Sequence, residues 1–385
     1  MVSLRSSLFT LSSLSLALAS PLSPRNDTIT TFSDKVIYTP PSDYNTPKVL
    51  YGRTAELTHS GDVLLATWEN YSPEPPLVYF PIYRSEDHGL TWDHISNVTD
   101  QVNGWGLRYQ PFLYELPEDF AGYAAGTVLL AGNSIPTNLS NTQIDLYAST
   151  DGGYTWEFLS HVAAGGEAEP DNGLTPVWEP FILLYNDQLV IYYSDQRDTA
   201  HGQKLVHQTS TDLLTWSDAV DDVSYAEYTD RPGMATVAEL PTGDFILAYE
   251  WGHNFSGSYS FAVTYRISAD PLGGFNGSEP TVLVAANTGT EPKGSPYVVW
   301  SGGVGGENGT IVVTSGGLST VFTNTFLGDG DQWYEYETPE PTSYSRSLRV
   351  FAEDETKLLI NGGGVLNGDN SVTLSVVNIA DLTEA

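Results

Sequence analysis

A short motif that recurs about every 60 residues constrains the fold of this chain more than any other feature. YRSEDHGLTW (83–92) and YASTDGGYTW (147–156) both fit the pattern Ser-x-Asp-x-Gly-x-Thr-Trp. QTSTDLLTW (208–216) is one residue shorter and lacks the glycine, and RISADPLGGF (266–275) keeps only the serine, the aspartate and a late aromatic residue. The four serines lie 64, 61 and 58 residues apart, and this regular spacing indicates a repeat architecture.

A second repeated element, made of a strand, a tight turn and an apolar strand, lies between the motifs. It occurs six times, over residues 55–70, 111–133, 180–195, 235–251, 295–317 and 347–363. Each unit is then an inner hairpin followed by an outer hairpin that carries the motif. Six units of four antiparallel strands predict an all-β fold, a six-bladed β-propeller, over residues 35–385. We expect a single domain whose two chain ends meet in one blade.

The motif resembles the Asp-box of sialidases and related propellers, and its chemistry is that of a turn. The aspartate and serine side chains can bond backbone N–H groups, the glycine supplies an unusual backbone angle, and the tryptophan packs beneath. The resemblance implies a position on the outer rim of the fold. We therefore interpret Asp87, Asp151 and Asp212 as structural residues.

The start of the chain has the pattern of a targeting segment. MVSLRSSLFTLSSLSLALAS contains one arginine, an apolar stretch and then Ala-Leu-Ala, which predicts a signal peptide over residues 1–19. The polar segment 20–34 predicts a loose arm. Sequons for N-glycosylation fit a secreted, extracellular glycoprotein and occur at Asn26, Asn70, Asn97, Asn138, Asn254, Asn276 and Asn308. Because the chain has no cysteine, burial of its core must supply its stability.

The charge of the chain limits its partners. A net charge of −33, with only 15 Lys and Arg residues, argues against nucleic-acid binding and favours a neutral substrate. No later segment approaches the ~20 continuous apolar residues of a membrane span. The seven histidines have no metal-ligand spacing, so we expect neither a catalytic metal nor another cofactor. We also expect a monomer.

Glu179 is an acidic residue that the repeat does not explain. It lies in TPVWEPFILLY (175–185), where an ionised carboxylate costs several kcal/mol unless it is paired. It starts the inner strand of its blade. Other blades carry polar residues at what we take to be the same position, namely Arg53, Gln110, Ser295 and Arg346. We therefore predict that Glu179 faces a central cavity, whereas the recurring Glu56, Glu115 and Glu239 are interpreted as scaffold.

Glu250 is a second candidate acid. It ends the second strand of the next blade, in ILAYEWGHN (246–254), between two aromatic residues. Glu69 and Asp195 end the corresponding strands of other blades, which weakens this signal. Two carboxyl groups in aromatic, partly dry surroundings suit glycoside hydrolysis, because one must hold a proton for the leaving oxygen while the other is ionised.

These features together resemble a known family. The leader, the degenerate Asp-boxes, TPVWEPF, ILAYEWG and the length of 385 residues are similar to those of fungal exo-arabinanases of glycoside hydrolase family 93. The resemblance implies a six-bladed propeller that releases arabinobiose from the non-reducing end of α-1,5-L-arabinan with retention. It also implies that Glu179 and Glu250 are the catalytic pair. We favour Glu179 as nucleophile and Glu250 as acid/base, and the reverse assignment stays open.

The ring position suggests further substrate-binding residues. Polar candidates for bonds to sugar hydroxyls or to a carboxylate are Arg53, Gln110, Arg197 and Arg346. Aromatic candidates for the cavity wall are Trp178, Trp251 and Tyr344. Each arginine is equally compatible with a structural ion pair, and each aromatic residue with plain core packing.

Three alternatives remain open from sequence. A sialidase on the same scaffold needs three arginines, and Arg53, Arg231, Arg346 and Tyr344 could supply parts of its site, but its early F/Y-R-I-P signature is replaced here by YGRT. Endo-arabinanases and arabinofuranosidases on other folds are usually five-bladed, which the repeat count argues against. A non-catalytic, glycan-binding Asp-box propeller would not need buried glutamates on neighbouring blades.

Overall fold

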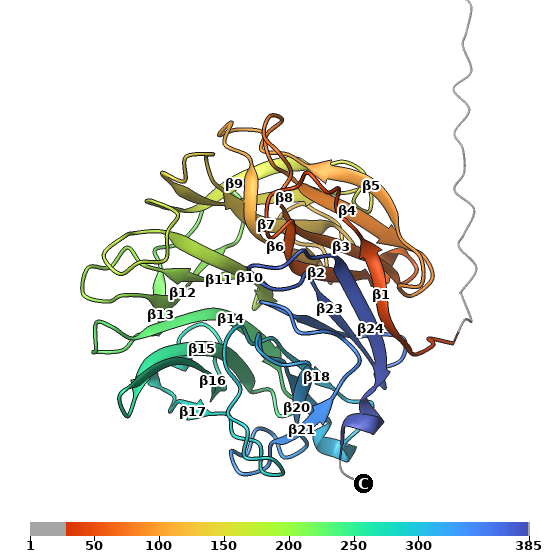
Figure 1. Cartoon of the computed structure of the whole chain (residues 1–385), viewed down its shortest axis with the longest axis vertical. Coiled ribbons are helices and arrows are strands. Elements are labelled where there is room, and N and C mark those ends of the chain that lie inside the picture. The colour runs from red at the N-terminus through yellow and green to blue at the C-terminus, as the bar shows by residue number, and fades with distance from the viewer. Residues whose placement is uncertain (1–27, 384–385) are drawn as a thin grey trace, which may run out of the picture.

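A computed structural model describes residues 28–383 of the chain, which form six four-stranded antiparallel sheets arranged around a centre (Figure 1). This arrangement confirms the predicted six-bladed propeller. The predicted signal peptide (1–19), the first part of the predicted arm (20–27) and Asn26 lie outside the described residues. No helix in the described part of the chain is long and apolar enough to cross a membrane.

Each of the first five blades takes four consecutive strands. The first contains β2 (Val49–Leu57), β3 (Val63–Asn70), β4 (Phe80–Ser85) and β5 (Asp93–Val98), and the second contains β6 (Leu107–Glu115), β7 (Val128–Ser134), β8 (Thr142–Ser149) and β9 (Glu157–Gly165). The third contains β10 (Val177–Tyr185), β11 (Gln188–Asp195), β12 (Lys204–Ser210) and β13 (Val220–Val223). The fourth contains β14 (Arg231–Glu239), β15 (Phe245–Phe255), β16 (Ser258–Ser268) and β17 (Thr281–Val282). The fifth contains β18 (Val298–Ser301), β19 (Thr310–Val313), β20 (Thr320–Asn324) and β21 (Tyr334–Glu337). Short 3-10 helices occur at Thr58–Ser60, Phe275–Gly277, Gly306–Asn308 and Ile379–Leu382.

The sixth blade joins the two ends of the chain, as the sequence predicted. It contains β22 (Ser347–Val350), β23 (Lys357–Gly362) and β24 (Val372–Asn378), and β1 (Phe32–Tyr38) adds the outermost strand by pairing with β24. Because β1 begins at Phe32 and Ile29 is already buried, the loose arm predicted over 20–34 extends too far into the fold.

The Asp-box forms the turn between the third and fourth strands of a blade. In the second blade, Ser149 Oγ accepts the N–H of Gly153 at 2.8 Å, and Asp151 accepts both the N–H and the hydroxyl of Thr155, at 2.9 and 2.6 Å. The indole of Trp156 donates to the carbonyl of Gly153 at 3.0 Å. The aspartates are therefore committed to their own turns, as interpreted from sequence.

The same turn also forms in blades where the Asp-box motif is incomplete or absent from the sequence. In the third copy Leu213 takes the place of glycine and still adopts a positive φ of 62°. The fifth blade has an equivalent turn without the Ser/Asp signature. There Asn324 takes over the role of those side chains, since its Oδ1 accepts the N–H groups of Phe326 and Gly328 at 2.8 and 2.9 Å.

Aromatic rings from three blades fill the axis of the propeller. Phe181 on β10 packs against Phe112 on β6, with ring centroids 4.7 Å apart, and against Tyr297 beside β18 at 6.4 Å. All three side chains are buried and belong to the largest apolar cluster of the described residues. Each of these rings lies two residues after a polar candidate of the sequence, namely Gln110, Glu179 and Ser295.

Candidate active site

Four blades carry a β-bulge near the start of the inner strand, and the fifth has a similar backbone conformation just before its inner strand. In these five blades one residue at this place has a positive φ although it is not glycine, which is a strained conformation for an L-residue. The five residues are Tyr51 (54°), Gln110 (57°), Glu179 (62°), Met234 (58°) and Ser295 (43°). The register of the inner hairpins shifts at this point in the first four blades, as expected for an inserted residue.

The backbone N–H of a bulge residue is held by a side-chain oxygen of the preceding blade. Four such bonds occur in the described residues: Gln110 N to Glu69 Oε1 at 3.0 Å, Glu179 N to Gln110 Oε1 at 3.1 Å, Met234 N to Glu179 Oε2 at 2.9 Å and Ser295 N to Glu250 Oε2 at 2.8 Å. Both candidate carboxylates are therefore fixed by main-chain donors and also join neighbouring blades.

The bulge corrects the alignment made from sequence. The first blade presents Tyr51 at the ring position, and Arg53 lies beyond the bulge, opposite Thr67. On the second strands, Gly233 pairs with Glu250 while Trp178 pairs with Ser194, so Ser194 rather than Asp195 is the counterpart of Glu250. Glu69, which pairs with Leu50, is a correct counterpart.

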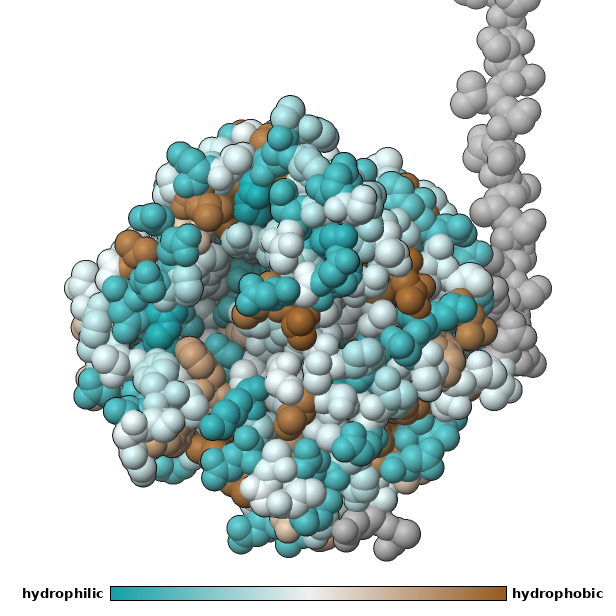
Figure 2. All heavy atoms as spheres, viewed as in Figure 1, coloured by the Kyte–Doolittle hydropathy of each residue, from teal (hydrophilic) through white to brown (hydrophobic). Residues whose placement is uncertain are grey.

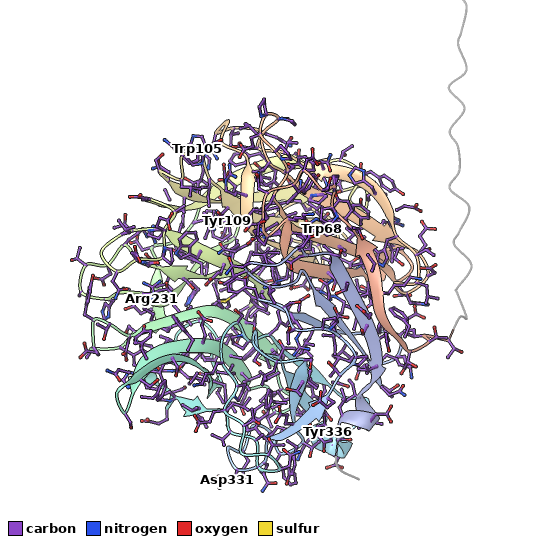
Figure 3. The ribbon with its side chains drawn as sticks, viewed as in Figure 1. Trp68, Trp105, Tyr109, Arg231, Asp331 and Tyr336 are labelled. Carbon is purple, nitrogen blue, oxygen red and sulfur yellow. The ribbon has the colours of Figure 1, made fainter. Side chains whose placement is uncertain are left out.

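A cavity of about 860 Å³ opens over this ring. Its polar lining includes Glu69, Gln110, Glu179, Gln203, Arg231 and Glu250, and its aromatic lining includes Tyr71, Tyr109, Trp178, Phe261 and Tyr344. The face seen in Figure 2 is hollowed near its centre, and Figure 3 labels Tyr109 on β6 and Arg231 at the start of β14. Of the residues proposed from sequence, the cavity thus brings together Glu179, Glu250, Gln110, Trp178 and Tyr344.

Two of the predicted arginines are buried away from the cavity. Arg53 lies 3.7 Å above the ring of Tyr51 and donates to Ser345 Oγ at 2.9 Å. Arg346 is fully buried and donates to the backbone carbonyls of Ser319 and Thr320. Neither arginine lines the cavity, and backbone acceptors hold Arg346 in the core. The charge of Arg53 still opposes the burial that raises the pKa of Glu179 and of Glu69, so its contact with a carboxylate stays a prediction.

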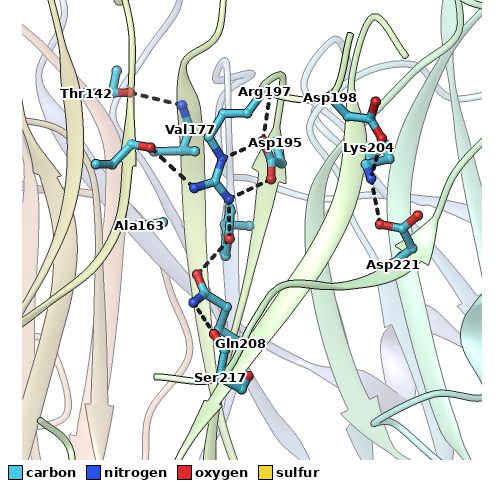
Figure 4. A network of polar contacts seen from close by, with 12 residues as sticks. Thr142, Ala163, Val177, Asp195, Arg197, Asp198, Lys204, Gln208, Ser217 and Asp221 are labelled. Carbon is cyan, nitrogen blue, oxygen red and sulfur yellow. Dashed lines mark hydrogen bonds and ion pairs between the residues drawn. The ribbon is translucent and has the colours of Figure 1, made fainter. Parts of the chain in front are cut away.

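Arg197 and Trp251 also lie outside the cavity lining. Arg197 forms a two-pronged ion pair with Asp195 at 2.9 and 2.7 Å, within the network drawn in Figure 4, so the structural ion pair considered from sequence is the one observed. Trp251 follows Glu250 on the strand and points to the opposite face of the sheet. There it stacks on Tyr225 with ring centroids 4.5 Å apart and donates to Asp230 at 3.1 Å.

Two residues of the cavity lining, Glu69 and Arg231, are not among the site residues that the sequence predicts for this cavity. Glu69 was considered only as a counterpart of Glu250, and Arg231 only as part of a sialidase site. Both residues occupy informative positions, since Glu69 lies near the end of a second strand and Arg231 begins an inner strand. To recognise them as site residues, one needs the strand register that the bulges set. Among residues 28–383, no group of three or more His, Asp or Glu side chains is arranged to hold a metal ion. The absence of a metal from the reaction stays a prediction.

Comparison with known proteins places this geometry in a family. No family model and no curated protein sequence matches the chain. Among solved structures, the α-L-arabinofuranosidase of Fusarium graminearum from glycoside hydrolase family 93, in complex with arabinobiose, is 54% identical with a TM-score of 0.88, over 91% of this chain and 99% of that one. The α-L-arabinanase of Penicillium chrysogenum, also complexed with arabinobiose, is 53% identical with a TM-score of 0.89, over 92% and 99% of the two chains.

The chain belongs to glycoside hydrolase family 93. It is therefore a glycoside hydrolase, as its resemblance to that family implied. The NanB sialidase of Streptococcus pneumoniae, at 10% identity and a TM-score of 0.61 over 91% of this chain and 71% of that one, shares the fold alone.

The two glutamates of this family 93 enzyme have unequal surroundings. Burial raises the pKa of Glu179, but its carboxylate accepts the hydroxyl of Ser194 at 2.7 Å and the N–H of Met234 at 2.9 Å, and the charge of Arg231 also opposes the shift. Burial raises the pKa of Glu250 to about 7, and the negative charge of Glu179 adds to this shift. Its single main-chain donor, the N–H of Ser295, opposes it. Glu250 is thus suited to hold a proton and Glu179 to remain ionised.

Glu69 is a third acid in the same cavity. Burial raises its pKa to about 7, against the opposing hydrogen bonds from the Tyr71 hydroxyl at 2.8 Å and the Gln110 N–H at 3.0 Å. Glu69 and Glu250 therefore stay partly protonated near neutral pH, which limits the repulsion between the carboxyls that line this hollow.

We predict that Glu250→Gln stabilises the protein at alkaline pH. The pKa of Glu250 is raised from 4.5 to about 7 by folding, so its contribution to stability is fully present below pH 4.5 and is lost as the pH rises through 7. A glutamine never ionises, so the variant should gain about 1–3 kcal/mol of unfolding free energy over the wild type at pH 8, and nothing at pH 4. Thermal melts at both values test this. Equal melting temperatures at pH 8 would contradict it.

Proposed function

We propose that the protein is a secreted, retaining exo-arabinanase that releases arabinobiose from the non-reducing end of α-1,5-L-arabinan. The observation that carries the proposal is the pair of glutamates on neighbouring blades, held at one cavity in unequal surroundings. The arabinobiose bound to the related proteins of Fusarium graminearum and Penicillium chrysogenum supports the choice of sugar. The aromatic lining offers faces on which uncharged sugar rings can pack.

In this mechanism Glu179 attacks the anomeric carbon while Glu250 gives its proton to the departing glycosidic oxygen. The bond to the leaving sugar breaks as a covalent glycosyl ester forms on Glu179. Glu250, now ionised, takes a proton from water, and that water displaces the ester and restores both side chains. The hydrogen bonds support this assignment of roles: two donors and a nearby cation favour the ionised Glu179, whereas Glu250 has one donor and a negative neighbour.

The charge of the cavity argues against the sialidase alternative. A sialidase must clamp the carboxylate of its substrate, and it uses three arginines to do so. Among the described residues that line the cavity, Arg231 is the one arginine and Lys293 the other cation, and they lie with Glu69, Glu169, Glu179 and Glu250. Four acids against two cations disfavour an anionic sugar.

The first test is the product. Incubated with linear α-1,5-L-arabinan, the purified protein should release arabinobiose from the start of the reaction, without intermediate oligomers, as followed by chromatography. A sialoside should stay intact. A ladder of oligomers would indicate endo action, free sialic acid would select the sialidase, and the absence of any product would favour a glycan-binding propeller.

The second test assigns the two glutamates. We predict that Glu179→Ala and Glu250→Ala each lose activity on arabinan by about 10²–10⁴-fold or more. With an aryl arabinobioside and added azide, Glu179→Ala should form an azide product of inverted anomeric configuration and Glu250→Ala one of retained configuration, which NMR distinguishes. The control Glu239→Ala changes an exposed glutamate of the same repeat and should act as the wild type. The opposite pair of configurations would exchange the two roles.

Secretion and oligomeric state form a separate proposal, supported by the leader pattern and the sequons. Expressed from its full gene in a eukaryotic host, the protein should appear in the medium with Ser20 as its first residue, and light scattering should give the mass of a monomer. Retention of the protein in the cells, or an intact residue 1–19 segment, would contradict secretion.

A further inference from the structure

Arg231 is held in the cavity by neutral groups only. Its guanidinium donates to Asn172 Oδ1 at 2.6 Å, to Gln196 Oε1 at 3.1 Å and to Gln203 Oε1 at 2.8 Å. Arg84, Arg108 and Arg197 pair with carboxylates, whereas Arg231 belongs with the described arginines that are held by neutral acceptors, such as Arg346. An amide cradle fixes the position of a guanidinium but leaves its charge uncompensated.

The cradle is itself oriented by further hydrogen bonds. Gln203 Nε2 donates to the carbonyl of Pro232 at 2.9 Å, and Gln196 Nε2 donates to the carbonyl of Asp171 at 3.2 Å. Gln196 Oε1 also accepts the indole N–H of Trp178 at 2.9 Å. Since the amide nitrogens have acceptors of their own, the amide oxygens must face Arg231.

The amide side chains around Arg231 come close to Glu250 at Gly233, which has no side chain to separate them. Gly233 lies two residues after Arg231 and pairs with Glu250 across β14 and β15. A Cβ at Gly233 would lie 2.7 Å from Gln203 Nε2 and 3.5 Å from Glu250 Oε1, so a larger residue would displace Gln203 and touch Glu250. The next residue, Met234, donates its N–H to Glu179. Arg231 thus stands at the start of the segment that contacts both glutamates.

We propose that Arg231 is the positioning cation of this site: its uncompensated charge favours the ionised form of both Glu179 and Glu250, and so sets the pH range in which the nucleophile is charged. The proposal rests on the roles assigned above to the two glutamates. Arg231 is not a catalytic residue in this account, because it acts through the ionisation of the two carboxyls. The neutral cradle is what keeps its charge available to them.

The electrostatics of the cavity agree with this geometry. Arg231 opposes the burial that raises the pKa of Glu179 and of Glu250, and the charge of Arg53 has the same effect on Glu179. Burial lowers the pKa of Arg231 itself, while Tyr259, the two glutamates and Asp171 oppose that change. The other titratable or charged groups that line this cavity are Glu69, Tyr71, Tyr109, Glu169, Lys293 and Tyr344.

Two kinds of variant test the proposal, read out by ¹³C NMR titration of glutamate carboxyls in the whole protein. The signals are assigned with Glu179→Gln and Glu250→Gln. Arg231→Gln removes the charge, and both carboxyl titrations should move to higher pH by about 1 unit or more. Arg231→Lys keeps the charge and should move them less. The remote control Arg84→Gln removes a rim cation paired with Glu86 and should leave both titrations in place.

Asn172→Asp tests the cradle without changing Arg231. The new carboxylate should pair with the guanidinium and cancel its charge, so the titrations should again move to higher pH. Because Asn172→Asp leaves Arg231 in place, it keeps the test valid if Arg231→Gln alone folds poorly.

Activity supplies an independent readout. The acidic limb of the pH profile on arabinan should move upward in Arg231→Gln and in Asn172→Asp by the same amount as the Glu179 titration. Unchanged titrations with uniformly low activity would overturn the proposal and leave Arg231 a substrate-binding or structural residue. If the titrations move but arabinan is not cleaved by the wild type, the proposed substrate fails while the role of Arg231 stands.

Discussion

The hydrogen bond that ties the inner-strand bulge of one blade to a polar side chain of the blade before it is the interaction on which this site depends. A bulge residue with positive φ is strained, and its N–H lies where no ladder partner can reach it. Side-chain oxygens from the neighbouring blade satisfy that N–H at 2.8–3.1 Å in four places. The same bonds offset part of the cost of keeping carboxylates in a partly dry cavity. Blade packing and site geometry therefore cannot vary independently.

The repeat then distinguishes two chemically identical side chains by where they stand. Glu179 comes from a bulge on an innermost strand, and Ser194 of its own blade donates to it. Glu250 comes from the middle of the second strand, β15, which runs further than the sequence predicted, and it takes the position that Ser194 occupies one blade earlier. Ser194 donates a hydrogen bond to Glu179, whereas in the next blade Glu250 itself stands in the place of that serine. The two carboxyls therefore differ in proton affinity because of their places in the repeat and not because of their residue type.

The sequence was sufficient to predict the architecture, because the period of the motif and the count of hairpins are local patterns. It also brought out Glu179 and Glu250, which interrupt apolar surroundings. It failed where one inserted residue changes the register, since a bulge cannot be seen in an alternating pattern. That slip placed Arg53 in the ring and hid the significance of Glu69 and Arg231, whereas Arg346 lies in the core because backbone carbonyls hold it there. Trp251 failed for a simpler reason, as successive residues of a strand face opposite sides of the sheet.

The blade shared by the two chain ends has a consequence for how this protein is made. Strand β1 leaves the ribosome first, yet its partner β24 is almost the last segment to be synthesised. Until then the growing chain can form only an open arc of blades, with apolar sheet faces on either side of the gap. Closure depends on contacts between residues more than 300 positions apart, such as Phe32 with Val376, which is the kind of topology that folds slowly. A nascent chain of this design remains vulnerable to association with its neighbours until its final strand arrives.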